Sequence, residues 1–94
     1  MTPEGKVKAK AKKILDDMGA YYFMPATGGY GRSGVPDIVG CLRGKFFGVE
    51  CKAGKGTPTL LQVRELNRIA EQGGFAMVVN EDNLDELKAA LARF

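Results

Sequence analysis

The apolar positions along the chain switch between two spacings, and each switch marks the boundary of an expected element. Apolar residues recur every three to four positions in three segments, which predicts helices. Short runs rich in β-branched and aromatic residues lie between them and predict strands. The expected helices are residues 3–18, 60–72 and 81–94, and the expected strands are residues 21–24, 37–42, 45–52 and 75–79.

Residues with capping propensity stand at the expected helix starts. Thr2 precedes Pro3 at the start of the first helix, and Pro is well tolerated at a first helical position. Either Thr57 or Thr59 can cap the second helix, and Asn80 can cap the third. Glycines follow the first and second helices, as is common at helix ends. A glycine-rich loop over residues 26–35 separates the first two strands.

The order of elements is therefore αβββαβα. Three consecutive strands, a crossover helix and a fourth strand predict a mixed four-stranded sheet flanked by helices, which is an α/β fold. At 94 residues, we expect a single domain spanning residues 1–94.

Two carboxylates and a lysine fall at the ends of the two central strands. Asp37 opens one strand, and Glu50 and Lys52 lie near the end of the next. Residues i and i+2 share a face of a strand, and the short turn at residues 43–44 should bring Asp37 near Glu50 across the ladder. Two carboxylates can hold a hard cation, and the ammonium can lie beside an attacking water. The alternative is a cross-strand ion pair on the surface of the sheet.

The composition narrows the choice of metal. Histidine is absent and the only cysteines are Cys41 and Cys51, so a zinc site of the usual Cys/His kind is effectively excluded. Oxygen ligands favour Mg²⁺ or Mn²⁺. Both cysteines lie in apolar runs, and we expect buried free thiols rather than a disulfide.

The net charge of +3 is unevenly distributed, with five lysines crowded into the first helix. A basic helix suits contact with a polyanion such as DNA, although a solvated helix face is the alternative. No apolar run approaches the roughly 20 residues that span a bilayer. We therefore expect a cytoplasmic protein that makes no membrane contact.

Glu4 and Gln62 do not fit a purely structural pattern. Glu4 lies within the apolar stripe of the first helix, so it either reaches the metal site or is a first-turn acid favoured by the helix dipole. Gln62 follows Thr59 by three residues, so it either points at the site or completes a capping box.

Taken together, these motifs resemble the virus-type replication-repair nuclease (VRR-NUC) domain, a branch of the PD-(D/E)xK nucleases. The matching segments are Gly34-Val35-Pro36-Asp37, Gly48-Val49-Glu50-Cys51-Lys52 and Thr59-Leu60-Leu61-Gln62, together with the first helix and Glu4. The resemblance covers essentially the whole chain and is closest to minimal stand-alone members of phage type. Cys51 replaces the more usual valine, and we expect the protein to lack the added DNA-binding domains of larger relatives.

The resemblance implies a restriction-endonuclease-like fold and a Mg²⁺- or Mn²⁺-dependent DNA endonuclease. Minimal members further imply a homodimer acting on branched DNA such as Holliday junctions, in DNA repair, within the host cell if phage-encoded. The expected catalytic residues are Asp37, Glu50, Lys52 and Gln62. The expected metal ligands are Glu4, Asp37, Glu50 and the backbone carbonyl of Cys51. The expected DNA contacts are Lys6, Lys10, Arg32, Ser33, Lys45 and Lys55.

Two other functions remain open from the sequence. A non-catalytic nucleic-acid-binding module could keep the fold, although the intact set of Asp37, Glu50 and Lys52 argues against it. A pure assembly domain would explain neither Glu4 nor the Pro36-Asp37 pair. Nicking assays with and without EDTA separate all three.

Overall fold

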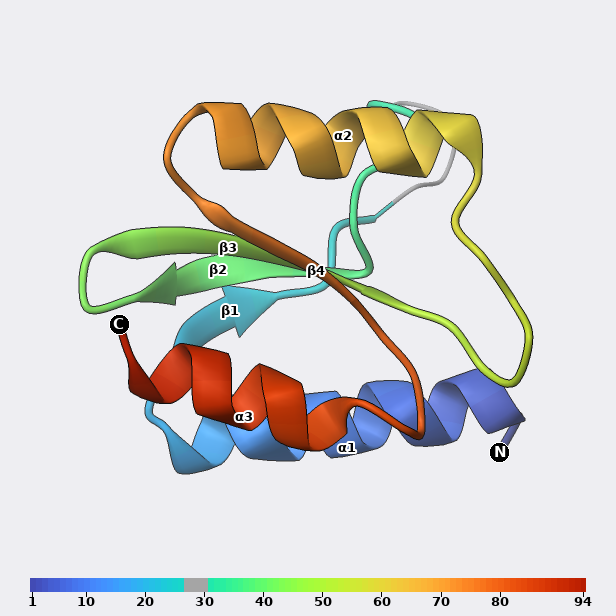
Figure 1. The fold of residues 1–94 in the computed structure, drawn as a ribbon, viewed down its shortest axis with the longest axis horizontal. Helices are drawn as coiled ribbons and strands as arrows, with labels where there is room; N and C mark the ends of the chain where they lie inside the picture. The colour runs from blue at the N-terminus through green and yellow to red at the C-terminus, as the bar shows by residue number, and fades with distance from the viewer. Residues whose placement is uncertain (27–30) are drawn as a thin grey trace.

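The computed structural model describes residues 1–26 and 31–94, so part of the expected loop over residues 26–35 lies outside it. The elements follow the predicted order αβββαβα (Figure 1). They are α1 (Pro3–Asp17), β1 (Tyr21–Phe23), β2 (Ile38–Leu42), β3 (Lys45–Cys51), α2 (Leu60–Glu71), β4 (Phe75–Val79) and α3 (Leu84–Ala92). Every helix in these residues is too short or too polar to cross a lipid bilayer.

The four strands form one mixed sheet in the order β1-β2-β3-β4, which confirms the expected fold class. β1 pairs with β2 and β2 pairs with β3 in antiparallel ladders. β4 pairs with β3 in parallel, because α2 carries the chain back over the sheet before β4 begins (Figure 1).

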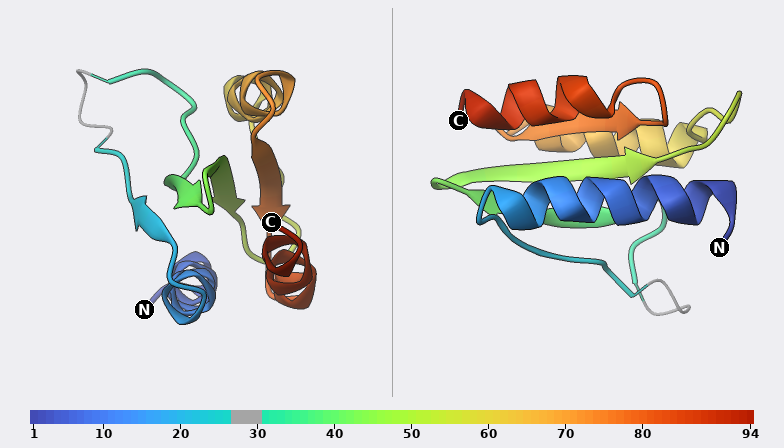
Figure 2. Two further views of the ribbon diagram at one scale, coloured as in Figure 1. Left: turned by 90° about the vertical axis from the view of Figure 1, so that its left-hand side faces the viewer. Right: turned by 90° about the horizontal axis from the view of Figure 1, so that it is seen from below.

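The helices form two layers on opposite faces of the sheet. α1 and α3 lie beside each other on one face, and α2 covers β3 and β4 on the other (Figures 1 and 2). The main core lies between the sheet and the α1–α3 layer. Its fully buried members include Ala11, Leu15, Phe47, Leu87 and Leu91.

The layer between the sheet and α2 includes a close contact at Gly48. A side chain at Gly48 would place its Cβ 2.6 Å from Cδ1 of Ile69 and 2.9 Å from Cγ of Pro36. A side chain there would have to displace the end of Ile69 and the ring of Pro36, so glycine lets both residues pack closely on the sheet. The apolar stripe expected along α2 is only partly buried: Leu66 is covered, but Leu60 and Val63 are exposed. The first turn of α2 packs against Gly34, which lies in the loop that leads into β2.

Several expected boundaries shift. β1 ends at Phe23, one residue earlier than expected, and Thr59 rather than Thr57 caps α2. The last helix starts at Leu84 instead of directly after Asn80. Asn80 and Asn83 build a turn there, since the side chain of Asn83 accepts a hydrogen bond from the Asn80 backbone (2.7 Å). Asparagine side chains commonly stabilise such turns at the expense of helix.

Candidate active site

The β2–β3 hairpin brings Asp37 to Glu50. Ile38 pairs with Val49, so the preceding residue, Asp37, lies opposite Glu50. The turn between the strands has positive φ at Arg43 (51°) and Gly44 (81°), as the favoured two-residue hairpin turn requires. Asp37 is then fixed by a hydrogen bond from the backbone N–H of Cys51 to its Oδ2, at 2.8 Å.

Glu50 and Lys52 point to the same side of β3, as their spacing predicts. Nζ of Lys52 lies 3.4 Å from Oε2 of Glu50. Glu50 is only 2% exposed, and its other oxygen, Oε1, has no hydrogen-bond partner among the described residues. A buried carboxylate oxygen without a partner is costly, and such atoms often mark the place of an unseen ion or ligand.

The electrostatics of the site disfavour two negative charges. Burial, followed by the negative charge of Asp37, raises the pKa of Glu50 from its ordinary 4.5 to about 7, although the neighbouring Lys52 acts to lower it. Burial, followed by the charges of Asp37 and Glu50, raises the pKa of the Cys51 thiol to about 12. The Cys51 side chain belongs to the core, so only its backbone carbonyl is available as a ligand. A cation placed between the two carboxylates would relieve their repulsion.

Glu4 is linked to this pair through Lys8. Nζ of Lys8 lies 3.6 Å from Oε2 of Glu4 and 3.6 Å from Oδ1 of Asp37. Burial alone would lower the pKa of Lys8, but the charges of Asp37 and Glu4 outweigh it and raise the pKa, which keeps the ammonium charged. Sequence reasoning missed Lys8, although its i,i+4 spacing from Glu4 indicates that both lie on one helix face.

The side chains at the site have the oxygen atoms that a hard cation prefers, but they are not arranged as a complete set of ligands. Asp37 and Glu50 supply carboxylate oxygens, and Glu50 Oε1 is free to bind. Across residues 1–26 and 31–94, no three Cys, Asp or Glu side chains lie close enough to form a ready-made metal cluster. Glu4 is held by Lys8 rather than placed directly against the pair. The two carboxylates therefore offer oxygen donors of the kind that hard divalent cations prefer.

Gln62 takes part in the capping box that the sequence offered as its alternative role. Its Oε1 accepts a hydrogen bond from the Thr59 backbone (2.9 Å), and the Thr59 hydroxyl accepts one from the Gln62 backbone (3.2 Å). These bonds fix the start of α2 beside the loop that follows Lys52. The side-chain oxygen of Gln62 is therefore bonded to the Thr59 backbone.

Arg32 contacts a carboxylate that the sequence analysis did not single out. Its Nε donates a hydrogen bond to Glu65, which is 6% exposed on α2. The hydrogen bond with Arg32 lowers the pKa of Glu65. Glu65 lies four residues before Ile69, a member of the apolar stripe expected along α2, and this spacing was the available signal. The contact ties the loop before Asp37 to α2, and it occupies a side chain expected to grip phosphate.

Gly34 strengthens this connection between loop and helix. Its φ is 81°, and a Cβ there would lie 2.6 Å from the backbone of Leu61. A side chain at this position would therefore push the loop away from α2. Gly34 and the Arg32–Glu65 pair together fix the segment that leads into Asp37.

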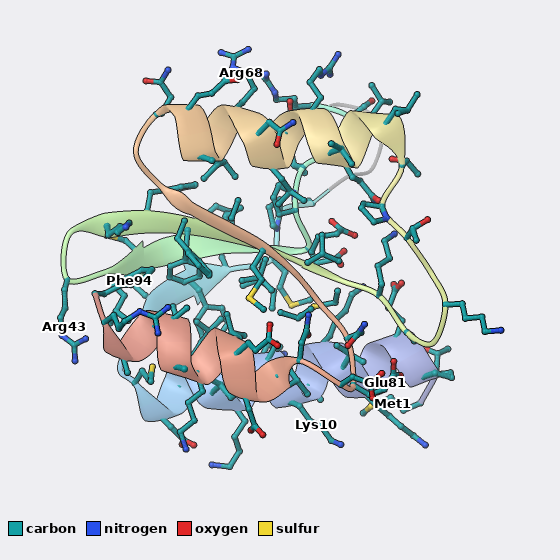
Figure 3. The ribbon with its side chains drawn as sticks, viewed as in Figure 1. Met1, Lys10, Arg43, Arg68, Glu81 and Phe94 are labelled. Carbon is teal, nitrogen blue, oxygen red and sulfur yellow. The ribbon has the colours of Figure 1, made fainter. Side chains whose placement is uncertain are left out.

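Lys45, one of the expected DNA contacts, lies far from Asp37 and Glu50. Lys45 begins β3 and stacks over the ring of Phe94, with Nζ 5.1 Å from its centroid. It is five residues before Glu50, and a strand rises ~3.3 Å per residue, so about 17 Å separate the two positions. Figure 3 shows Phe94 at the opposite end of the molecule from Met1 and Glu81. Lys45 therefore does not border the site.

The other residues expected to contact DNA are all exposed. Lys6 and Lys10 lie on α1 and border a small cavity with Glu81, which Figure 3 shows beside the start of that helix. Ser33 and Lys55 are exposed in the loops before β2 and after β3. Lys10 projects from the side of α1 away from the sheet (Figure 3), so it can contact only DNA that extends around that helix.

Comparisons with known proteins point to a family of nucleases. The chain is 39% identical over 62 residues to "Putative nuclease p44" of Acyrthosiphon pisum secondary endosymbiont phage 1, spanning 65% of this chain and 67% of that protein. It resembles a solved structure described as "VRR_NUC domain", with a TM-score of 0.74 and 29% identity over 93% of this chain and 95% of that chain. No protein-family model matches the sequence.

A mixed sheet that presents Asp37, Glu50 and Lys52 at the end of its central hairpin defines a nuclease of the PD-(D/E)xK type. The chain belongs to the VRR-NUC family of nucleases.

Proposed function

We propose that this nuclease is a Mg²⁺- or Mn²⁺-dependent endonuclease that hydrolyses phosphodiester bonds in branched DNA. The observation that carries the proposal is the buried Glu50 carboxylate opposite Asp37. One of its oxygens lacks a hydrogen-bond partner in the described structure, and Lys52 lies 3.4 Å from the other. Two close carboxylates, one of them buried, destabilise the folded protein when no cation lies between them. The same two carboxylates would supply ligands to a bound cation.

In the proposed mechanism, Asp37, Glu50 and the backbone carbonyl of Cys51 would hold the ion, and Glu4 would complete the site directly or through water. When bound, the ion supplies a more acidic water and neutralises charge on the phosphate. Lys52 is placed to orient that water or to stabilise the negative charge that develops on the phosphate oxygens. The Cys51 N–H holds Asp37 in position for this task.

The DNA backbone would be held by lysines of α1 and by lysine and serine side chains of the loops around the site. Lys6, Lys10, Ser33 and Lys55 serve this role in the proposal, and Arg32 does so only if it leaves Glu65. Contacts of this kind position the duplex without reading its sequence. They suit an enzyme that selects DNA by shape.

The proposal places two copies of the domain, residues 1–94, on one substrate in the host cytoplasm. A Holliday junction offers two symmetric cleavage points, and a C2 dimer offers two sites. The exposed apolar side chains of Leu60, Leu61 and Val63 on α2 give such a dimer apolar surface to bury. The relevant partner is then a second copy of this chain.

A substrate panel tests this function. Single-stranded, duplex, flap and four-way junction DNA are compared at equal concentration in Mg²⁺ and in Mn²⁺, and the oligomeric state is measured by sedimentation. The expected result is fastest cleavage of the four-way junction, by paired nicks, from a dimer. Equal rates on linear duplex and junction would contradict the proposed substrate, and a monomer at working concentration would contradict the proposed assembly.

A further inference from the structure

Lys8 is the side chain at this site whose role the catalytic motif does not explain. It lies one turn after Glu4 on α1, with its ammonium between a carboxylate of the helix and a carboxylate of the hairpin. Both distances are 3.6 Å, longer than the 2.7–2.9 Å typical of a charge-assisted hydrogen bond. The ammonium therefore sits between two anionic partners without a tight bond to either.

The charges at the site explain why a cation is needed there. Glu4, Asp37 and Glu50 contribute three negative charges when ionised, and Lys52 is paired with Glu50. Without Lys8, Glu4 and Asp37 would have no cationic partner within ion-pair distance among the described residues. Lys8 thus offsets the charge of the two carboxylates that Lys52 does not neutralise.

The ammonium of Lys8 can also move away from the two carboxylates into solvent. Its side chain is 30% exposed, so the flexible stem has a route to solvent. A divalent ion bound to Asp37 and Glu4 would repel an ammonium that lies 3.6 Å from the same oxygens. The lysine and the ion therefore compete for one set of ligands.

We propose that Lys8 is an internal counter-cation, which holds Glu4 and Asp37 together in the metal-free protein and must release them when a divalent ion binds. It is a positioning residue that sets metal affinity, and it takes no part in the chemical step. The inference rests on the proposed function, because it assumes that Glu4 and Asp37 face the ion.

Two other roles for Lys8 make different predictions. A phosphate contact would be needed for DNA affinity, so its loss would weaken DNA binding and leave metal affinity unchanged. A second catalytic lysine would be needed for turnover, so its loss would slow cleavage at saturating metal. A counter-cation predicts the opposite sign for metal binding, since its loss should tighten it.

The test is Mn²⁺ titration by calorimetry of the wild-type chain, Lys8→Gln and Lys12→Gln. Lys12 is the matched control, because it lies one further turn along α1 and its substitution changes the net charge equally. Loss of the two ion pairs predicts Mn²⁺ binding about fivefold tighter in Lys8→Gln. The control should change less than twofold. In EDTA, Lys8→Gln should melt at a lower temperature than the control, and saturating Mn²⁺ should restore more of its stability.

Equal or weaker Mn²⁺ binding by a folded Lys8→Gln would overturn the inference. Lys8→Met, which keeps most of the aliphatic stem, repeats the measurement if the glutamine variant does not fold. Asp37→Asn in the same titration separates the two hypotheses. If Asp37→Asn binds Mn²⁺ as tightly as wild type, the proposed metal site is wrong. If it loses the ion while neither Lys8 variant binds more tightly, only the role of Lys8 is wrong.

Discussion

The carboxylate of Asp37 accepts a hydrogen bond from the backbone N–H of Cys51 at 2.8 Å. This bond joins the residue before β2 to the strand that carries Glu50 and Lys52 on either side of Cys51. The relative position of the three side chains is therefore set by the hairpin itself. The hairpin therefore holds these three side chains together without help from a substrate, and such fixed positions favour catalysis.

Asp37→Asn and Asp37→Ala should both reduce cleavage by at least about a thousandfold, because each removes a charged ligand worth several kcal/mol in the transition state. Their stabilities should differ. Asparagine keeps an oxygen for the Cys51 N–H, whereas alanine leaves that group without its partner and should cost about 1 kcal/mol relative to asparagine. Urea unfolding in EDTA measures the difference. Asp17→Asn, on the exposed end of α1, is the control and should cleave normally.

Metal-free protein should lose stability as the pH rises from about 5 to 7. The pKa of Glu50 in the folded protein is about 7, above its ordinary value of 4.5. Between these values the folded state binds more protons than the unfolded state, so stability falls with rising pH and levels off above pH 7. Glu50→Gln removes this dependence. It should be the more stable protein at pH 8, by on the order of 2 kcal/mol.

Urea unfolding in EDTA at several pH values checks this prediction, with the exposed Glu71→Gln as the control. Parallel stability curves for wild type and Glu50→Gln would mean that Glu50 does not carry the raised pKa. Metal affinity of the wild type should rise across the same interval, because the ion competes with the proton for the Glu50 carboxylate.

Lys52→Ala should slow the chemical step by at least about a hundredfold while DNA affinity in Ca²⁺ changes little, as expected for an interaction made mainly in the transition state. Lys52→Arg should rescue poorly, because guanidinium is larger, planar and does not give up its proton. Single-turnover cleavage beside a binding titration separates the two effects. Lys55→Ala, in the next loop, should show the reverse pattern. Equal losses of binding and rate in Lys52→Ala would make it a phosphate contact.

Gln62→Ala and Thr59→Ala separate a catalytic role from a structural one. Each breaks the capping box and should cost about 1 kcal/mol of stability. If Gln62 also positions Lys52 or the phosphate, only Gln62→Ala should slow single-turnover cleavage, by about tenfold or more. If both variants lose the same stability and both cleave at near-normal rates, the role of Gln62 is limited to capping α2.

Local spacing was sufficient to predict the hairpin and the residues it brings together. The i,i+2 relation placed Glu50 and Lys52 on one side of β3, and the short turn placed Asp37 opposite Glu50. These features depend on neighbours in a single ladder, whose register the turn fixes. The crossover helix similarly followed from the order of elements and gave the parallel β4.

Features that depend on contacts between distant segments were missed. The Arg32–Glu65 hydrogen bond joins residues 33 positions apart, and no local pattern indicates which basic residue will meet that carboxylate. Lys45 was expected to contact DNA because it lies at the end of a strand. It lies at the first residue of β3, however, whereas Glu50 lies near the last. Lys8 was hidden among the other lysines of α1, since its partner Asp37 lies 29 residues later.

The most direct test of the metal-dependent mechanism is nicking of a four-way junction in Mg²⁺, in Mn²⁺ and in excess EDTA, by wild type, Asp37→Asn and Glu50→Gln. The oxygen-only ligand set predicts cleavage by wild type with either ion, no cleavage in EDTA, and recovery when Mg²⁺ is added back in excess. Both variants should bind the junction and leave it intact in either ion. Undiminished cleavage in EDTA, or near-wild-type rates from either variant, would contradict the mechanism.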